Sequence, residues 1–161
     1  MRFTSFLLLL FWIHVASAFE IAEFKTGMTK DKVREQLKDW NFDRIQEFSA
    51  STLLAYDLPE KRTNRQFTFS FCNDRLVGFE QALKPSLKNF IIVANNYIKS
   101  NGQPYKTEAN TSVLSAGEKN LLALFWRSSN EIIGVKFIVL NDAEQLSNVY
   151  EAPNTCWAIP R

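Results

Sequence analysis

Histidine is almost absent from this chain of 161 residues, which contains it once, at position 14. His14 lies in an apolar N-terminal stretch that we expect to be removed, so the mature chain would contain no histidine. That absence excludes Ser-His-Asp and Cys-His catalysis. It also excludes zinc, copper and non-haem iron sites built on histidine ligands. We therefore predict that the protein is not an enzyme, holds no metal and needs no cofactor.

Cysteine, glycine and proline are also scarce. The two cysteines, Cys72 and Cys156, predict one disulfide if the chain is exported, and two separate buried thiols are the alternative. Five glycines and five prolines are few for a linker-rich or disordered chain, whereas aromatic residues reach 14% and favour a packed globular domain. A formal net charge of +2 gives no strong electrostatic footprint, so we expect no nucleic-acid partner.

The N-terminus has the three parts of a secretory signal peptide. Arg2 supplies a basic start, residues 6–15 are almost wholly apolar, and three small residues follow at 16–18. The apolar run is shorter than the ~20 residues of a membrane span. We predict a signal peptide over residues 1–18, with an uncleaved anchor as the alternative. The remaining residues, 19–161, would form a single globular domain without an integral membrane span, secreted or periplasmic.

The segment FKTGMTKDKV, residues 24–33, is typical of a helix entrance. Thr29 can act as the N-cap, because its hydroxyl can accept a hydrogen bond from an amide of the first turn. Met28 and Val33 then occupy the two positions of a hydrophobic staple. An apolar stripe at helical spacing follows, and we predict a helix over residues 29–40.

Period-two alternation predicts strands after this helix. Residues 51–58 form one candidate strand. Residues 66–72 alternate phenylalanine with small polar residues, and residues 76–83 return after a turn at Asn73-Asp74, so this segment predicts a hairpin. A broad apolar face then predicts a second helix over residues 87–100.

The second half of the chain repeats this order. We predict a strand over residues 107–114, a hairpin from residues 120–127 and 131–140, and a short final helix or turn over residues 142–150. Each half then runs helix, strand, loop and hairpin, which indicates a possible internal duplication. The predicted fold class is α+β, an antiparallel sheet with helices packed on one face and the other face at least partly open.

The helix entrance also resembles a motif of two related groups of proteins. Gly27, Met28 and Thr29, with Val33 four positions on, are similar to the start of the helix in the small outer-membrane lipoproteins of the barrel-assembly machinery and in β-lactamase-inhibitor-protein-like domains. The segment Asn101-Gly102-Gln103-Pro104 resembles the Gly-x-Pro element of the same family. The resemblance implies helices on a curved antiparallel sheet and a non-enzymatic role in binding other proteins. The chain departs from the lipoprotein pattern because no cysteine stands at the cleavage site.

The second hairpin is apolar on both faces, so one face needs cover beyond the helices. Its alternation points Trp126 to one face and Phe125 to the other. One interpretation is that the C-terminal tail, with Cys156 and Trp157, is clamped over the uncovered face through Cys72. The other is a partner-binding face, since aromatics and arginine dominate interface hot spots. Its candidate residues are Phe125, Trp126, Arg127 and Lys136.

Other polar residues give weaker signals. Asp57 with Glu60 and Asp142 with Glu144 are expected to be solvated or capping carboxylates. Glu80 lies on a strand opposite the face of Phe79 and is expected to join a salt bridge, although a hydrolase that uses carboxylates alone stays a third hypothesis. The basic loop at residues 61–65 is either a solvated turn or a patch for an anionic lipid or acidic partner. Asn110 begins an N-glycosylation sequon, which matters only in a eukaryotic source.

These patterns favour an exported, non-enzymatic protein-binding domain, either inhibitor-like or an envelope-assembly factor, that uses a face of its sheet. The expected partner is another exported or envelope protein. The alternative function is a carrier of a small apolar ligand held between the sheet and the helices.

Overall fold

The computed structural model describes residues 20–60, 65–128 and 130–157. The predicted signal peptide and residues 61–64 of the basic loop lie outside the described residues.

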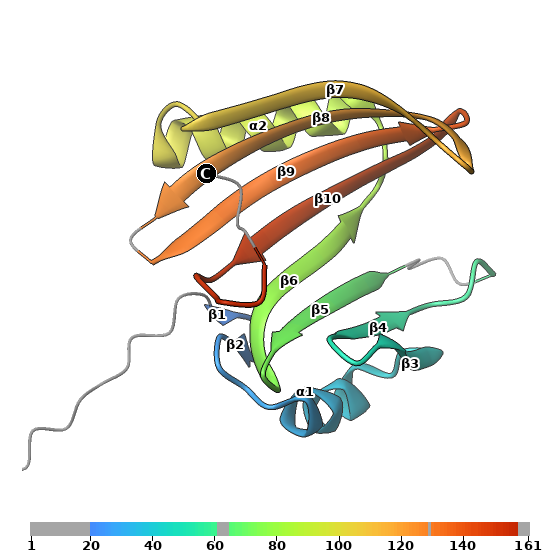
Figure 1. Cartoon of the computed structure of the whole chain (residues 1–161), viewed down its shortest axis with the longest axis vertical. Helices are drawn as coiled ribbons and strands as arrows, with labels where there is room; N and C mark the ends of the chain where they lie inside the picture. The colour runs from blue at the N-terminus through green and yellow to red at the C-terminus, as the bar shows by residue number, and fades with distance from the viewer. Residues whose placement is uncertain (1–19, 61–64, 129, 158–161) are drawn as a thin grey trace, which may run out of the picture.

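One antiparallel sheet of eight strands dominates the structure (Figure 1). The strand order is β3-β4-β5-β6-β10-β9-β8-β7, so the fourth strand of each half pairs with the other at the centre. The first four of these strands in chain order are β3 (Arg44–Ser49), β4 (Thr52–Tyr56), β5 (Gln66–Cys72) and β6 (Arg75–Leu83). The others are β7 (Lys106–Leu114), β8 (Gly117–Ser128), β9 (Glu131–Leu140) and β10 (Ala143–Glu151). A small ribbon of β1 (Glu20–Ile21) and β2 (Phe24–Lys25) precedes them.

The predicted α+β fold class is wrong, because the chain is mostly β. More than half of the described residues lie in strands, and the helices are minor elements: α1 (Lys30–Leu37), a 3-10 turn η1 (Lys38–Trp40) and α2 (Leu87–Asn101). The segment predicted as a final helix or turn, residues 142–150, is the central strand β10, and β3 was not predicted at all. The predicted unit of helix, strand, loop and hairpin is wrong in its strand content, because each half runs one helix followed by four consecutive strands.

The helix entrance is confirmed. The Thr29 hydroxyl accepts a hydrogen bond from the Lys32 amide at 3.3 Å, and Asp31 lies in the first turn. Met28 is partly buried against the same cluster as Val33, as expected for a hydrophobic staple. The α-helix ends earlier than predicted, at Leu37, and η1 completes the predicted span.

Aromatic side chains of β5 and β6 form the core of the first half. The three phenylalanines of β5 are buried, as their alternation predicted, and Phe69 is at the centre of the cluster. Its ring centroid lies 4.8 Å from that of Phe24 and 5.2 Å from that of Phe79. α1 closes this cluster with Val33 and Leu37.

A second cluster lies between α2 and strands β8 and β9. Phe90 and Ala94 of α2 contact a group that includes Trp126, whose indole N–H donates to the Gly102 carbonyl at 2.8 Å. The predicted apolar face of this helix is only partly buried, since Leu87 and Ile91 are about half exposed. The buried face of α2 is narrower than its sequence indicates.

Glu131, the first residue of β9, is a destabilising group in the same half. Its Oε2 is buried and has no hydrogen-bond partner among the described residues, and burial raises the pKa of this carboxyl. An acid whose pKa is raised on folding holds its proton more tightly in the folded state. Stability is therefore lost as the pH rises from the ordinary glutamate value, about 4.3, through the folded value.

Glu131→Gln is expected to raise the melting temperature near neutral pH, because the buried charge is removed. The difference from the wild type should shrink and vanish as the pH falls below about 4, where both states are protonated. Thermal unfolding at both pH values measures this, with Glu144→Gln as the control because Glu144 is exposed. A Glu131→Gln gain that is independent of pH would contradict this account.

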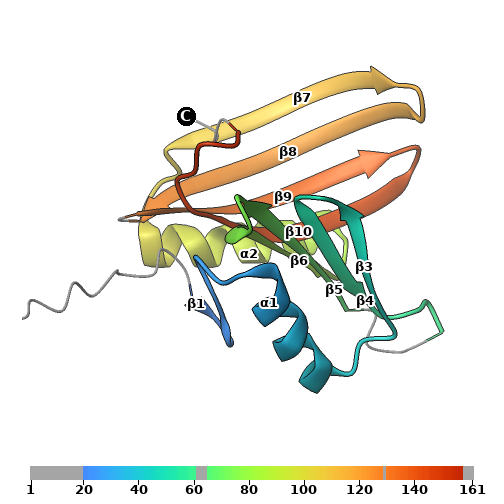
Figure 2. The same ribbon diagram turned by 60° about the horizontal axis from the view of Figure 1, so that its bottom comes forward.

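Both helices lie on the same side of the large sheet (Figure 2). Phe79, in the α1 cluster, and Leu83, which packs against the α2 cluster, are four residues apart on β6 and therefore share a face. The other side of the sheet carries no helix of the described chain, and we call it the helix-free face.

Candidate functional site

Three central strands place a polar cluster on the helix-free face. Glu80 on β6 pairs with Val149 on β10, and Ser147, two residues before Val149, pairs with Lys136 on β9. Directly paired residues and residues two apart share a face of a sheet, so Glu80, Ser147 and Lys136 gather there.

The cluster is tied together by hydrogen bonding and charge. The Ser147 hydroxyl donates to Glu80 Oε1 at 2.6 Å, and the Lys136 ammonium lies 3.6 Å from Glu80 Oε2. Ser147 is only 8% exposed, whereas Glu80 and Lys136 stay partly open to solvent. The predicted salt-bridge role of Glu80 is confirmed, and Ser147 and Lys136 hold its carboxylate in place.

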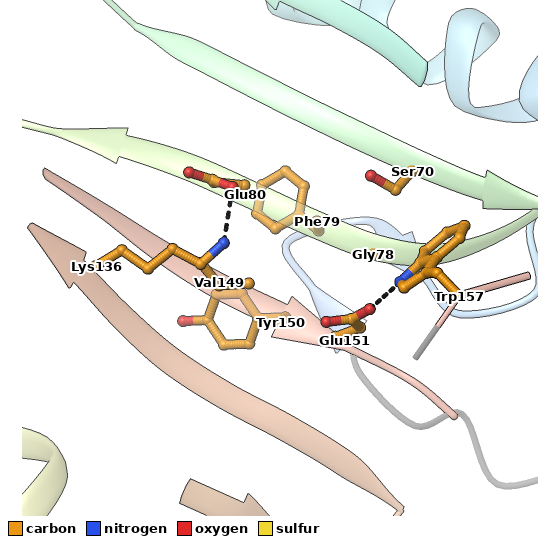
Figure 3. Close-up of a pocket in the computed structure, with 9 residues that line it drawn as sticks. All are labelled: Ser70, Gly78, Phe79, Glu80, Lys136, Val149, Tyr150, Glu151 and Trp157. Carbon is orange, nitrogen blue, oxygen red and sulfur yellow. Dashed lines mark hydrogen bonds and ion pairs between the residues drawn. The ribbon is translucent and has the colours of Figure 1, made fainter. Parts of the chain in front are cut away.

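Two hollows adjoin Glu80. The first has a volume of about 240 Å³ and extends over Gly78 toward the C-terminal tail (Figure 3). Its lining residues are Ser70, Gly78, Phe79, Glu80, Lys136, Val149, Tyr150, Glu151 and Trp157. The second, about 220 Å³, shares Glu80 with the first and also includes Ser147, Gln66, Ala82 and Gln145. The centre of the face is therefore indented on both sides of Glu80.

A glycine keeps the first hollow open. A Cβ at Gly78 would lie 3.1 Å from the Ser70 Cβ, which is tighter than ordinary contacts. Gly78 and Ser70 are paired across β6 and β5. Small residues at both paired positions leave space that larger side chains would fill.

The predicted disulfide between Cys72 and Cys156 is confirmed, and it fixes the C-terminal tail. The Asn154 side-chain oxygen accepts hydrogen bonds from the amides of Cys156 and Trp157, and the Trp157 indole N–H donates to Glu151. Trp157 lines the hollow over β6 and β10, as Figure 3 shows. The suggested clamp thus brings Trp157 to the hollow at the centre of the sheet.

The four predicted partner-binding residues do not share one surface. Trp126 is 1% exposed and faces α2, whereas Phe125 is 3% exposed and lies in a cluster with Ala123 and Ile132 on the helix-free face. A Cβ at Gly134 would lie 2.7 Å from the Phe125 ring, so that ring covers the glycine. Arg127 is exposed and its guanidinium lies 4.9 Å from the centre of the Tyr105 ring. Of the four, Lys136 lines the first hollow.

The other candidate carboxylates are placed elsewhere. Asp57 is buried and accepts hydrogen bonds from the Arg65 guanidinium at 2.9 and 3.1 Å, and these bonds raise the pKa of Arg65. Asp142 is exposed at the β9–β10 turn, Glu144 is exposed near the start of β10, and Glu60 is exposed after β4. No cluster of three metal-ligating side chains occurs within the described ranges.

Sequence reasoning missed Ser147 and the position of Trp157. Ser147 lies in the segment 142–150, which was predicted as a short final helix or turn and is the strand β10. A usable signal was present: Asn141-Asp142 repeats the Asn73-Asp74 dipeptide, and all four residues have positive φ values in tight hairpin turns. The repeated dipeptide could have predicted a strand after residue 142.

Comparison with known proteins gives no relative: no family model, no curated protein and no solved structure matches this chain. Within residues 20–60, 65–128 and 130–157, no helix has the length and apolar character needed to cross a membrane.

Proposed function

We propose that this protein is an exported, non-enzymatic binding domain that holds another exported or envelope protein against the helix-free face. It acts as an inhibitor or as an envelope-assembly factor. The observation that carries the proposal is the indented centre of that face, where Glu80, Ser147 and Lys136 are held in place beside two hollows. A preorganised polar centre with adjoining recesses favours association, because less side-chain freedom is lost on binding.

Three further features support the proposal. The N-terminal pattern is that of a signal peptide, and a disulfide is typical of exported proteins. The residues Gly27, Met28 and Thr29 resemble the helix start of families that bind proteins.

Catalysis by Ser147 is disfavoured by its place in the sheet. β10 is paired on both sides, so the amides around Ser147 are used by the strand ladders and cannot form an oxyanion hole. The apolar-carrier alternative gains no support, since Phe90 and Ala94 pack directly on the sheet and the two hollows described here adjoin Glu80 on the other face.

The test is capture of exported proteins from the source organism on the immobilised mature protein. Thr68→Arg places a bulky side chain on the helix-free face, because Thr68 pairs with Glu80. Thr107→Arg makes the same change on β7, where pairing with Leu124 puts it on the helix side. We expect a partner retained in stoichiometric amount by the wild type and by Thr107→Arg, and weakened by roughly tenfold or more by Thr68→Arg.

Melting curves of both variants control for misfolding. A partner that binds all three proteins equally would contradict the proposed face. Equal loss of partner binding in Thr68→Arg and Thr107→Arg, with unchanged melting curves, would contradict it as well.

A further inference from the structure

The first hollow has carboxylates at two ends and an aromatic wall. Glu80 lies at one end with Lys136, and Glu151 lies at the other beside Trp157 (Figure 3). The two glutamates and one lysine give this lining a net charge of −1. Within the part of the chain that the structure describes, no cationic side chain pairs with Glu151, whose Oε1 accepts from the Trp157 indole.

Glu80 also keeps bonding capacity toward the hollow. Its Oε1 is occupied by Ser147, but Lys136 is 3.6 Å from Oε2, which is too long for a direct hydrogen bond. A stronger donor can therefore bind Oε2 without breaking a hydrogen bond within the protein.

Trp157 is restrained in position as the aromatic wall of the hollow. The disulfide at Cys156, the Asn154 oxygen and Glu151 all restrain it, while the side chain stays partly exposed. A restrained indole loses little freedom on binding, and its ring face attracts cations.

The size of the hollow selects the kind of ligand. Sites for drug-sized molecules measure ~300–1,000 Å³, and this hollow measures about 240 Å³. It fits one long side chain better than a free metabolite. A planar guanidinium can lie flat on an aromatic ring while its several N–H groups bond carboxylates, whereas a lysine ammonium is a compact point charge without a flat face.

We infer that the hollow receives an arginine side chain of the partner, with its guanidinium against Trp157 and bonded to Glu151 and Glu80. The inference rests on the proposed function, because the arginine would belong to the protein partner. It adds the kind of side chain that anchors this partner in the hollow.

The experiment is an NMR titration of the isotopically labelled mature protein with N-acetyl-arginine amide. The Trp157 indole N–H and the Gly78 amide should shift and saturate in the millimolar range. N-acetyl-citrulline amide has nearly the same shape without the charge and should bind at least about tenfold more weakly. Glu151→Gln should weaken arginine binding several-fold, and Glu35→Gln, an exposed change on α1, should leave it unaltered.

Because Glu151→Gln can also move Trp157, Glu80→Gln is a second variant, read at the Gly78 amide. Weakening in either variant, with the free-state spectrum preserved, supports the site. Equal response to arginine and citrulline amides, or no saturable shift at Trp157 and Gly78, overturns the inference. Loss of partner capture in Thr68→Arg without any arginine response would overturn this inference alone and leave the proposed binding face standing.

Discussion

Replacing both cysteines by serine is expected to lower the free energy of unfolding by about 4 to 5 kcal/mol, the figure that the chain-entropy model gives as an upper value for so long a loop. The disulfide joins residues 84 positions apart, from the end of β5 to the C-terminal tail. Without it, the unfolded chain gains freedom and the tail loses its covalent attachment to the sheet. Urea unfolding of Cys72→Ser/Cys156→Ser measures the loss.

The wild type under a reducing agent should show a similar loss. Thr155→Ala is a matched control in the same tail, since it leaves the disulfide intact, and it should change stability by less than about 0.5 kcal/mol. If the free energy of unfolding of the double variant lies within about 1 kcal/mol of that of the oxidised wild type, the disulfide contributes little to stability.

Phe69→Ala is expected to cost 3–5 kcal/mol, roughly the range for deleting a buried aromatic ring. Phe69 is fully buried and lies between Phe24 and Phe79, where the surrounding strands cannot close the space that its ring would leave. This loss is a large part of the ~5–15 kcal/mol that holds a domain folded.

Phe48→Ala is the matched control because Phe48, on the edge strand β3, is 73% exposed. It should change the free energy of unfolding by about 0.5 kcal/mol or less. Chemical unfolding of both variants measures the difference. Similar losses of unfolding free energy in Phe69→Ala and Phe48→Ala would contradict the placement of the core.

The elements with strong local signals were predicted from the sequence. The N-cap at Thr29, the alternating phenylalanines of β5 and the turn at Asn73-Asp74 each act through neighbouring residues. Local chemistry of this kind does not depend on the rest of the fold, so the first helix and the first hairpin were correct.

The elements that depend on distant partners were missed. All six residues of β3 are exposed, so an edge strand held by pairing with β4 shows no apolar face in its sequence. β10 begins with three exposed residues and carries both Ser147 and Val149 on one face. It is a strand because it pairs with β6 and β9 on its two sides, and this pairing cannot be read from the local sequence.

The candidate site was only partly predictable for the same reason. Glu80 was recognised from its hairpin, but Ser147 and Lys136 join it through pairings across three strands. Trp157 is held at the hollow by the neighbouring disulfide. The pairing of the two cysteines could be predicted from the sequence, but the position of Trp157 on the sheet could not.

Site-specific photo-cross-linking in the source organism tests the central claim most directly. A photoreactive residue at Thr68 or Gln145, both on the helix-free face, should yield one discrete adduct of an exported partner. The same residue at Ile92 on α2 or at Val113 on β7, which are exposed on the helix side, should yield none. Adducts at Ile92 or Val113 without any at Thr68 and Gln145 would contradict the assignment of the binding face.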